Sequence, residues 1–155
     1  MACSQFFTRA WLLSILISIA LVSFQVAVAQ KNTASFPDGL WLTKKKDTAV
    51  RIEPCGKALC GYISWLRPDV DQVTPDGKPL CDTRVLWDFV QDTSHPDVWK
   101  GGKIFRANKG KVYSGRITVH GPDAIELRGY LGLPFIGKSY RLTRVRETSY
   151  PPCSS

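Results

Sequence analysis

Residues 111–131, KVYSGRITVHGPDAIELRGYL, alternate between apolar and polar side chains on both sides of a short break. Before the break, Tyr113, Ile117 and Val119 fall on one face of an extended chain, and polar side chains fall on the other. This period of two residues is typical of a β-strand with one buried face. Residues 121–123 (GPD) are of the types that turns prefer. The stretch therefore predicts two antiparallel strands joined by a tight connection.

The same pattern of short apolar runs between turn residues extends over the chain after residue 38. No ten-residue stretch there has the 3.6-residue period of an amphipathic helix. Closely spaced strands form a sandwich or a barrel, and short connections late in the chain favour an up-and-down order. We therefore predict an all-β domain, a single antiparallel up-and-down β-barrel of about eight strands. The expected strands cover residues 39–45, 48–53, 59–66, 83–90, 103–107, 111–120, 124–131 and 138–145.

Length and composition fit one folded domain. The chain has 155 residues, 44% of them hydrophobic and 22% charged, which is not the composition of a disordered protein. No long apolar run follows residue 30, so a polytopic membrane protein is excluded. The longest irregular segment, residues 67–82, is either a lid over one barrel mouth or a plain long loop.

The first 29 residues have the pattern of a secretory signal peptide. Arg9 precedes an apolar run over residues 10–24, and the small residues AVA stand at 27–29. An uncleaved signal anchor is the alternative, because residues 10–30 carry no charge and are about long enough to cross a bilayer. Polar serines and a glutamine make this a poor span, which favours cleavage. We expect an exported protein of the periplasm or cell envelope, with no stable membrane span after cleavage.

The chain is basic, with a formal net charge of +8. A basic exported protein is attracted to anionic lipids, polysaccharides and nucleic acids. The lysines and arginines are scattered, however, and we interpret the one run, Lys44 to Lys46 beside Asp47, as a solvated hairpin tip rather than a binding patch. Nucleic acid would need exposed aromatic residues interleaved with a basic groove, so no nucleic-acid partner is predicted.

Four cysteines remain after the signal segment, and an even count in an exported chain indicates disulfides, with three possible connectivities. Cys55 and Cys60 could face each other across a hairpin, and Cys81 would then pair with Cys153 and hold the C-terminal tail. Zinc is the alternative, but the cysteine spacing is not a zinc pattern and an oxidising compartment opposes it.

Seven short motifs follow one another in an order that is similar to a known family. Together they resemble the bacterial exported family called domain-of-unknown-function family 2147, over nearly all of residues 38–146. The resemblance implies a small lipocalin-like β-barrel over residues 38–146, followed by a tail over residues 147–155, and it implies no chemistry. The motifs are Gly39-x-Trp41, Cys55-Gly56-x3-Cys60-Gly61-x-Ile63, Pro79-Leu80-Cys81, Trp99-x-Gly101-Gly102-Lys103-Ile104, Gly110-Lys111-x-Tyr113-Ser114-Gly115-Arg116-Ile117, Leu127-Arg128-Gly129-Tyr130-x-Gly132, and Gly137-Lys138-Ser139 followed by Thr143-Arg144.

The first of these motifs is also similar to the first strand of lipocalins. In those barrels the tryptophan closes the bottom of the barrel, and an arginine from the last strand lies across it. The resemblance gives these structural roles to Trp41 and Arg144. A guanidinium over an indole face contributes about 0.5–2 kcal/mol.

Aromatic residues are the candidates for lining a ligand cavity. A ligand lining is possible because eight-stranded barrels can just enclose one small ligand. The other interpretation of these side chains is ordinary β-core. The arginines on the late strands are explained by outward ion pairs, or else they grip an anionic ligand head inside the barrel. The candidate ligand-binding residues are Trp65, Trp87, Trp99, Tyr113, Arg116, Arg128 and Tyr130.

No catalytic residue, metal ligand or cofactor is predicted. His95 and His120 stand at expected turns, and no serine has the surroundings of a nucleophile elbow. The acidic residues of the segment 67–82 miss the spacing of a calcium loop. A reactive thiol at Cys81 is less plausible than its disulfide with Cys153.

Three functions follow from this sequence. The first is an exported protein that binds a small apolar or amphipathic ligand in its barrel. The alternative is a non-catalytic structural or interaction protein, with a packed barrel and a basic surface for envelope partners. The third, an enzyme, would require a polar cluster with perturbed pKa values in a cleft. The sequence leaves the ligand and the oligomeric state open, because fold alone does not determine function.

Overall fold

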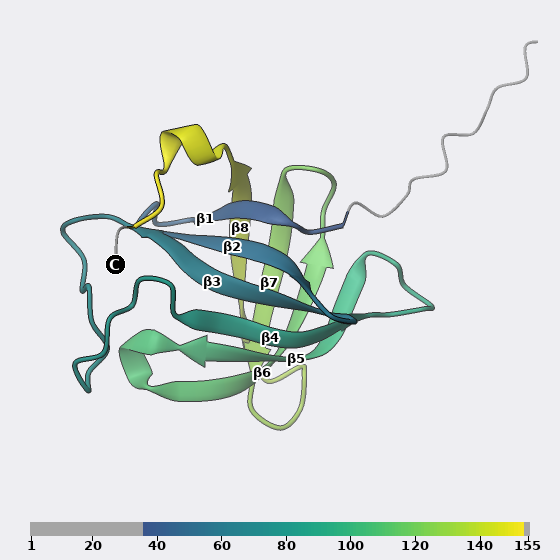
Figure 1. The fold of residues 1–155 in the computed structure, drawn as a ribbon. Helices are drawn as coiled ribbons and strands as arrows, with labels where there is room; N and C mark the ends of the chain where they lie inside the picture. The colour runs from purple at the N-terminus through teal and green to yellow at the C-terminus, as the bar shows by residue number, and fades with distance from the viewer. Residues whose placement is uncertain (1–35, 154–155) are drawn as a thin grey trace, which may run out of the picture. The chain divides into compact units, whose positions relative to one another are not determined.

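The computed structural model describes residues 36–153, which form a closed barrel of eight antiparallel strands (Figure 1). Each strand pairs with the next, and β8 pairs with β1, so the order is up-and-down as predicted. No helix in this part of the chain is long and apolar enough to cross a bilayer. The predicted signal peptide, residues 1–29, lies outside the described residues. The elements are β1 (Gly39–Thr43), β2 (Thr48–Cys55), β3 (Ala58–Leu66), β4 (Arg84–Gln91), β5 (Val98–Arg106), η1 (Ala107–Lys109), β6 (Lys111–Val119), β7 (Ala124–Tyr130), β8 (Gly137–Val145) and η2 (Glu147–Ser149).

Strand β5 begins earlier than the alternation indicates. It starts at Val98, whereas the sequence pattern placed its start at residue 103. The register to β6 shifts between Trp99 and Gly102, and Gly101 has φ +77°. The glycine pair is therefore a β-bulge inside the strand rather than the entry to it, and the strand continues through the bulge.

The connections alternate between the two ends of the barrel, because each strand runs opposite to its neighbours. One end, which we call the mouth, holds the connections at residues 44–47, 67–83, 107–110 and 131–136. The other, the closed end, holds those at residues 56–57, 92–97 and 120–123. In Figure 1 the first three mouth connections lie at the left and the fourth lies at the bottom.

Large side chains fill the half of the barrel next to the closed end. Trp41, Ile117 and Phe89 are completely buried there. The Phe89 ring lies directly over the backbone of Gly102 and Gly115; a Cβ on Gly115 would be 2.8 Å from its Cζ. Glycine is required at both positions because the aromatic ring occupies the space of a side chain.

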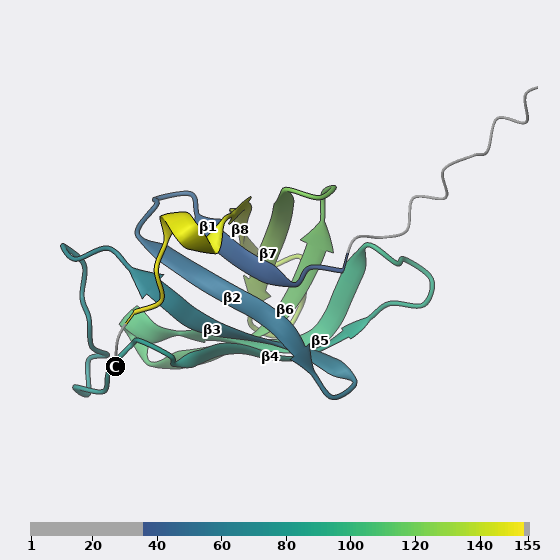
Figure 2. The same cartoon turned by 45° about the horizontal axis from the view of Figure 1, so that its top comes forward.

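The C-terminal tail covers part of the outside of the barrel. Leu40, Leu42 and Ala49 form a second buried cluster, against which Trp65 and Tyr150 pack. The rings of Trp65 and Tyr150 meet edge to face with centroids 4.9 Å apart. Figures 1 and 2 show the yellow tail passing along β1 and β2 toward the β3–β4 loop. The outer face of the first strands is therefore apolar and covered, not solvated.

Candidate ligand-binding cavity

The half of the barrel next to the mouth contains a cavity of about 900 Å³. Its inner wall carries no charged side chain and is built from inward-facing aliphatic residues of six strands. An apolar chain would be accommodated there, whereas a charge would be desolvated without a partner. The wall residues are Val50, Ile63, Leu66, Val85, Leu86, Ile104, Leu127 and Leu142.

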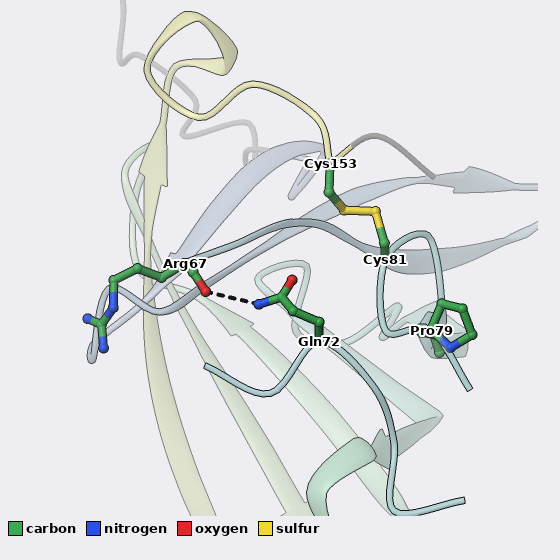
Figure 3. The surroundings of a disulfide bond; sticks show 6 residues. Arg67, Gln72, Pro79, Cys81 and Cys153 are labelled. Carbon is green, nitrogen blue, oxygen red and sulfur yellow. Dashed lines mark hydrogen bonds between the residues drawn. A yellow bond between two sulfur atoms is a disulfide. The ribbon is translucent and has the colours of Figure 1, made fainter. Parts of the chain in front are cut away.

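The β3–β4 loop lies against the mouth. Its Leu80 is only 7% exposed and joins the main hydrophobic cluster, and Val70 and Asp71 also line the cavity. The Gln72 side chain donates a hydrogen bond to the backbone carbonyl of Arg67 at 3.1 Å (Figure 3). The backbone carbonyl of Gln72 accepts a hydrogen bond from the Leu80 amide at 2.9 Å. Of the two interpretations of this segment, the structure therefore supports a cover over part of the mouth.

Two disulfides are present with the pairing that the spacing favoured. Cys55 and Cys60 are bonded across the β2–β3 turn, and Cys81 is bonded to Cys153. The second bond ties the C-terminal tail to the β3–β4 loop (Figure 3). The backbone amide of Cys153 also donates to the carbonyl of Ser64 on β3 at 2.7 Å. The cover over the mouth is thus anchored to the barrel wall through the tail.

Charged residues gather around the rim of the cavity. Six of the lining residues are basic and two are acidic. The two acidic residues are Asp47 and Asp71. The carboxylate of Asp47 accepts a hydrogen bond from the Thr43 hydroxyl at 2.6 Å. Within residues 36–153, none of the six cations forms an ion pair with a carboxylate. The basic rim residues are Lys44, Lys45, Arg106, Lys109, Lys138 and Arg141.

Two of the seven candidate ligand residues, Tyr113 and Tyr130, line the cavity. The three tryptophans do not. Trp65 lies on the outer face against Tyr150, Trp99 is buried at the closed end with its ring 5.1 Å from that of Phe36, and Trp87 is half-buried outside the cavity lining. Strand alternation separates two faces but does not tell which half of the barrel a residue occupies or what covers its outer face.

The two candidate arginines also lie outside the cavity, on the outer face of the β6–β7 pair, where Arg116 stands opposite Arg128. Arg128 donates hydrogen bonds to the carbonyls of Pro134 at 2.8 Å and Phe135 at 3.1 Å, and to the hydroxyl of Ser139 at 3.0 Å. Through these bonds Arg128 holds the β7–β8 loop, and its side chain lies outside the cavity lining.

The closed end is sealed by the tryptophan–arginine pair that the lipocalin resemblance implies. The Arg144 guanidinium lies 4.4 Å from the centroid of the Trp41 ring. Arg144 also donates to the carbonyl of Pro122 at 2.6 Å and to that of Asp38. The Trp41 indole donates to the Pro37 carbonyl at 3.0 Å. This network joins the β6–β7 turn and the entry of β1, and it leaves the mouth as the open end.

The groups with shifted pKa values lie on loops, away from the cavity wall. Hydrogen bonds from Thr74 and Lys78 lower the pKa of Asp76 to about 2. The Lys100 ammonium, 2.7 Å away, and the Ser94 amide hold the pKa of Asp92 below its usual value. Within residues 36–153 we find no cluster of three or more side chains suited to hold a metal ion.

Sequence reasoning missed the basic rim because its members are far apart in the chain. The Lys44–Lys46 run was interpreted as an isolated solvated tip, and Arg106, Lys109, Lys138 and Arg141 were not connected with it. A signal was available: alternate connections of an up-and-down barrel lie at the same end, so cations near the first, fifth and seventh connections must share one mouth.

Comparisons with known proteins agree with the fold. A family model described as "Uncharacterized protein conserved in bacteria (DUF2147)" matches residues 39–144. The solved structure of HP1028 from Helicobacter pylori, described as belonging to the lipocalin family, is similar in fold, with a TM-score of 0.58. The two sequences are 17% identical, and the match covers 72% of this chain and 84% of the other. No curated protein sequence matches the chain.

Proposed function

Because the chain belongs to the bacterial family DUF2147 and its barrel is lipocalin-like, we propose that it is an exported carrier of a small amphipathic ligand. The observation that carries the proposal is the cavity of about 900 Å³ between the packed half of the barrel and the mouth. Binding sites for small ligands are concave, mostly apolar, and of about 300–1,000 Å³.

The chemistry of the cavity favours an apolar tail and an anionic head. The wall offers a ligand mainly aliphatic contacts, together with the rings of Phe105, Tyr113 and Tyr130, so the buried part of the ligand must be largely apolar. The rim offers six cations that are not paired with carboxylates in the described part of the chain. A negative head group at the rim would keep its hydration and gain attraction to Lys44, Lys138 or Arg141.

Export is the part of the proposal that rests on the N-terminal pattern and the disulfides. Two disulfides in a small domain are typical of an oxidising compartment. The predicted signal peptide gives a route to the periplasm or cell envelope, where amphipathic ligands are abundant.

The alternative, a packed barrel that presents a basic surface to envelope partners, is supported less well than the carrier proposal. The barrel is packed only from Phe89 to the closed end, and it is hollow toward the mouth. Its second premise, a coherent basic surface, is met at the rim.

The experiment is a fluorescence titration of the mature protein with dansyl-undecanoic acid and, separately, with its methyl ester. We expect saturable binding with enhanced dansyl emission, and tighter binding of the acid than of the ester because only the acid carries the negative head. In parallel, native mass spectrometry of protein purified gently from its own envelope fraction should show bound mass beyond the polypeptide.

A matched pair of variants locates the probe. A side chain at Gly129 would start 3.5 Å from Ile104 and extend into the cavity, so Gly129→Phe should abolish binding. Val112→Phe places the same ring on the outer surface, where Val112 is exposed, and should leave binding unchanged. Equal affinity of Gly129→Phe and the unaltered protein, or no saturable binding of either probe, would refute the carrier proposal. Circular dichroism of each variant establishes that it is folded.

A further inference from the structure

The β7–β8 loop presents an apolar tip at the mouth. Residues 131–136 read LGLPFI, without a polar side chain. Leu131 is 64% exposed, Leu133 54%, Phe135 73% and Ile136 64%. Monomeric soluble proteins rarely expose so many large apolar side chains together, and such patches mark interaction sites. In Figure 1 this loop projects at the lower edge of the barrel, beyond the ends of the strands that it joins.

The tip is held outward by its own hydrogen bonds. Arg128 donates to the carbonyls of Pro134 and Phe135, as described above, and the Ile136 amide donates to the Leu133 carbonyl at 3.0 Å. These bonds occupy loop carbonyls without burying the loop's apolar side chains. The exposure is therefore a feature of a defined conformation, and little conformational entropy is lost when the tip docks.

The surroundings of the tip are positively charged. Residues 127–146 contain no aspartate or glutamate, and Lys138 and Arg141 follow the tip on β8. The other rim cations lie in the β1–β2 and β5–β6 connections or, for Arg106, at the end of β5, and these positions are at the same end of the barrel. An apolar tip that is followed by Lys138 and Arg141, at the same end of the barrel as the other rim cations, is complementary to the surface of a bilayer that contains anionic lipids. Such a surface offers hydrocarbon below and negative charge above.

We propose that residues 131–136 insert into the interface of an anionic lipid bilayer, so that the mouth of the barrel faces the membrane. A second copy of the chain is a less suitable partner for residues 131–136. The open edge of β8, residues 137–141, has no partner on β1, but Lys138 and Arg141 would repel the same charges of another copy. The docking goes beyond the carrier proposal and does not require a ligand in the cavity. If the carrier proposal and the membrane docking are both correct, a ligand passes between the bilayer and the cavity without crossing water.

The test is flotation of the mature protein with vesicles of phosphatidylglycerol and phosphatidylcholine, compared with vesicles of phosphatidylcholine alone. We expect binding to the anionic vesicles and about fivefold weaker partitioning for each rim cation removed, as in Lys138→Gln. Removing the apolar tip with Leu133→Ser and Phe135→Ser together should weaken partitioning at least about tenfold.

Matched controls lie at the closed end. Val90 is an exposed apolar residue on β4 and Lys57 is an exposed cation in the β2–β3 turn, so Val90→Ser and Lys57→Gln should bind vesicles as the unaltered protein does. Gly129→Phe, in which the cavity is blocked, should also bind vesicles, which separates this proposal from the carrier proposal.

Three outcomes would overturn the docking. One is the absence of binding to anionic vesicles. Another is binding that the charge variant weakens and the tip variant does not, which would show adsorption without insertion. The third is a dimer by light scattering that dissociates in the tip variant, which would assign the tip to a second copy of the chain.

Discussion

Removal of the Cys81–Cys153 disulfide should cost about twice the free energy of unfolding that removal of Cys55–Cys60 costs. The first bond joins residues 72 positions apart and the second joins residues 5 positions apart. The loop-closure entropy that a cross-link removes from the unfolded chain grows with the logarithm of this separation. It amounts to about 4 kcal/mol for the long loop and about 2 kcal/mol for the short one.

The comparison uses two variants, Cys81→Ala with Cys153→Ala, and Cys55→Ala with Cys60→Ala. Each variant replaces the same atoms, so the difference between them isolates the loop that is closed. Some contacts of the tail survive in the first variant, since Tyr150 still packs against Trp65. These contacts belong to the folded state and do not change the entropy of the unfolded chain.

The assay is urea unfolding followed by tryptophan fluorescence, with the midpoint and the slope fitted separately for each protein. A typical domain is stable by only about 5–15 kcal/mol, so the long-loop variant should unfold at a much lower urea concentration. Equal losses in the two variants, or a larger loss for the short loop, would refute the entropic reasoning and assign the stabilisation to local contacts around each bond.

Three further predictions concern the closed end, the packed half and the mouth loop. Arg144→Met should lower the free energy of unfolding by about 2–3 kcal/mol, because it removes the contact with Trp41 and two hydrogen bonds to carbonyls; an unchanged denaturation midpoint would contradict this. Gly115→Ala should cost about 1–3 kcal/mol by overpacking, measured as a lower melting temperature. The carboxyl of Asp76 should titrate by NMR with a pKa of about 2, and Thr74→Val should move that pKa toward 3.8, because the largest contribution to the shift is lost. Since the folded-state pKa is the lower one, the stabilisation by Asp76 is present above pH 3.8 and is lost as the pH falls through about 2. An Asp76 pKa that Thr74→Val leaves unchanged would count against the Thr74 hydrogen bond as its cause.

Local pattern was sufficient for most of the strands. The alternation around Tyr113 and Ile117 assigns both residues to the interior, and both are there. The start of β5 was not predictable in this way, because the bulge at Gly101 shifts the register and hides the alternation between Trp99 and Lys103.

The candidate site was predicted less well than the fold. Tyr113 and Tyr130 line the cavity, but the aromatic residues with the largest apolar surface do not. Trp65 is half-buried on the outer face by Tyr150, a residue 85 positions later in the chain. Arg128 has its hydrogen-bond partners in a loop that the sequence pattern describes only as a turn.

The sequence by itself determined the number and order of the strands and their antiparallel pairing, because these follow from local periodicity and turn residues. It suggested the cysteine pairs, and the structure decided between the three possible connectivities. Only the tertiary structure decided that the barrel is half packed and half hollow, since that depends on how Phe89 meets Gly102 and Gly115 from neighbouring strands. It also decided that cations in or near three distant turns share one rim with an exposed apolar loop. Closure of the barrel brings alternate connections to the same end, and side chains far apart in sequence then act on the same ligand or surface.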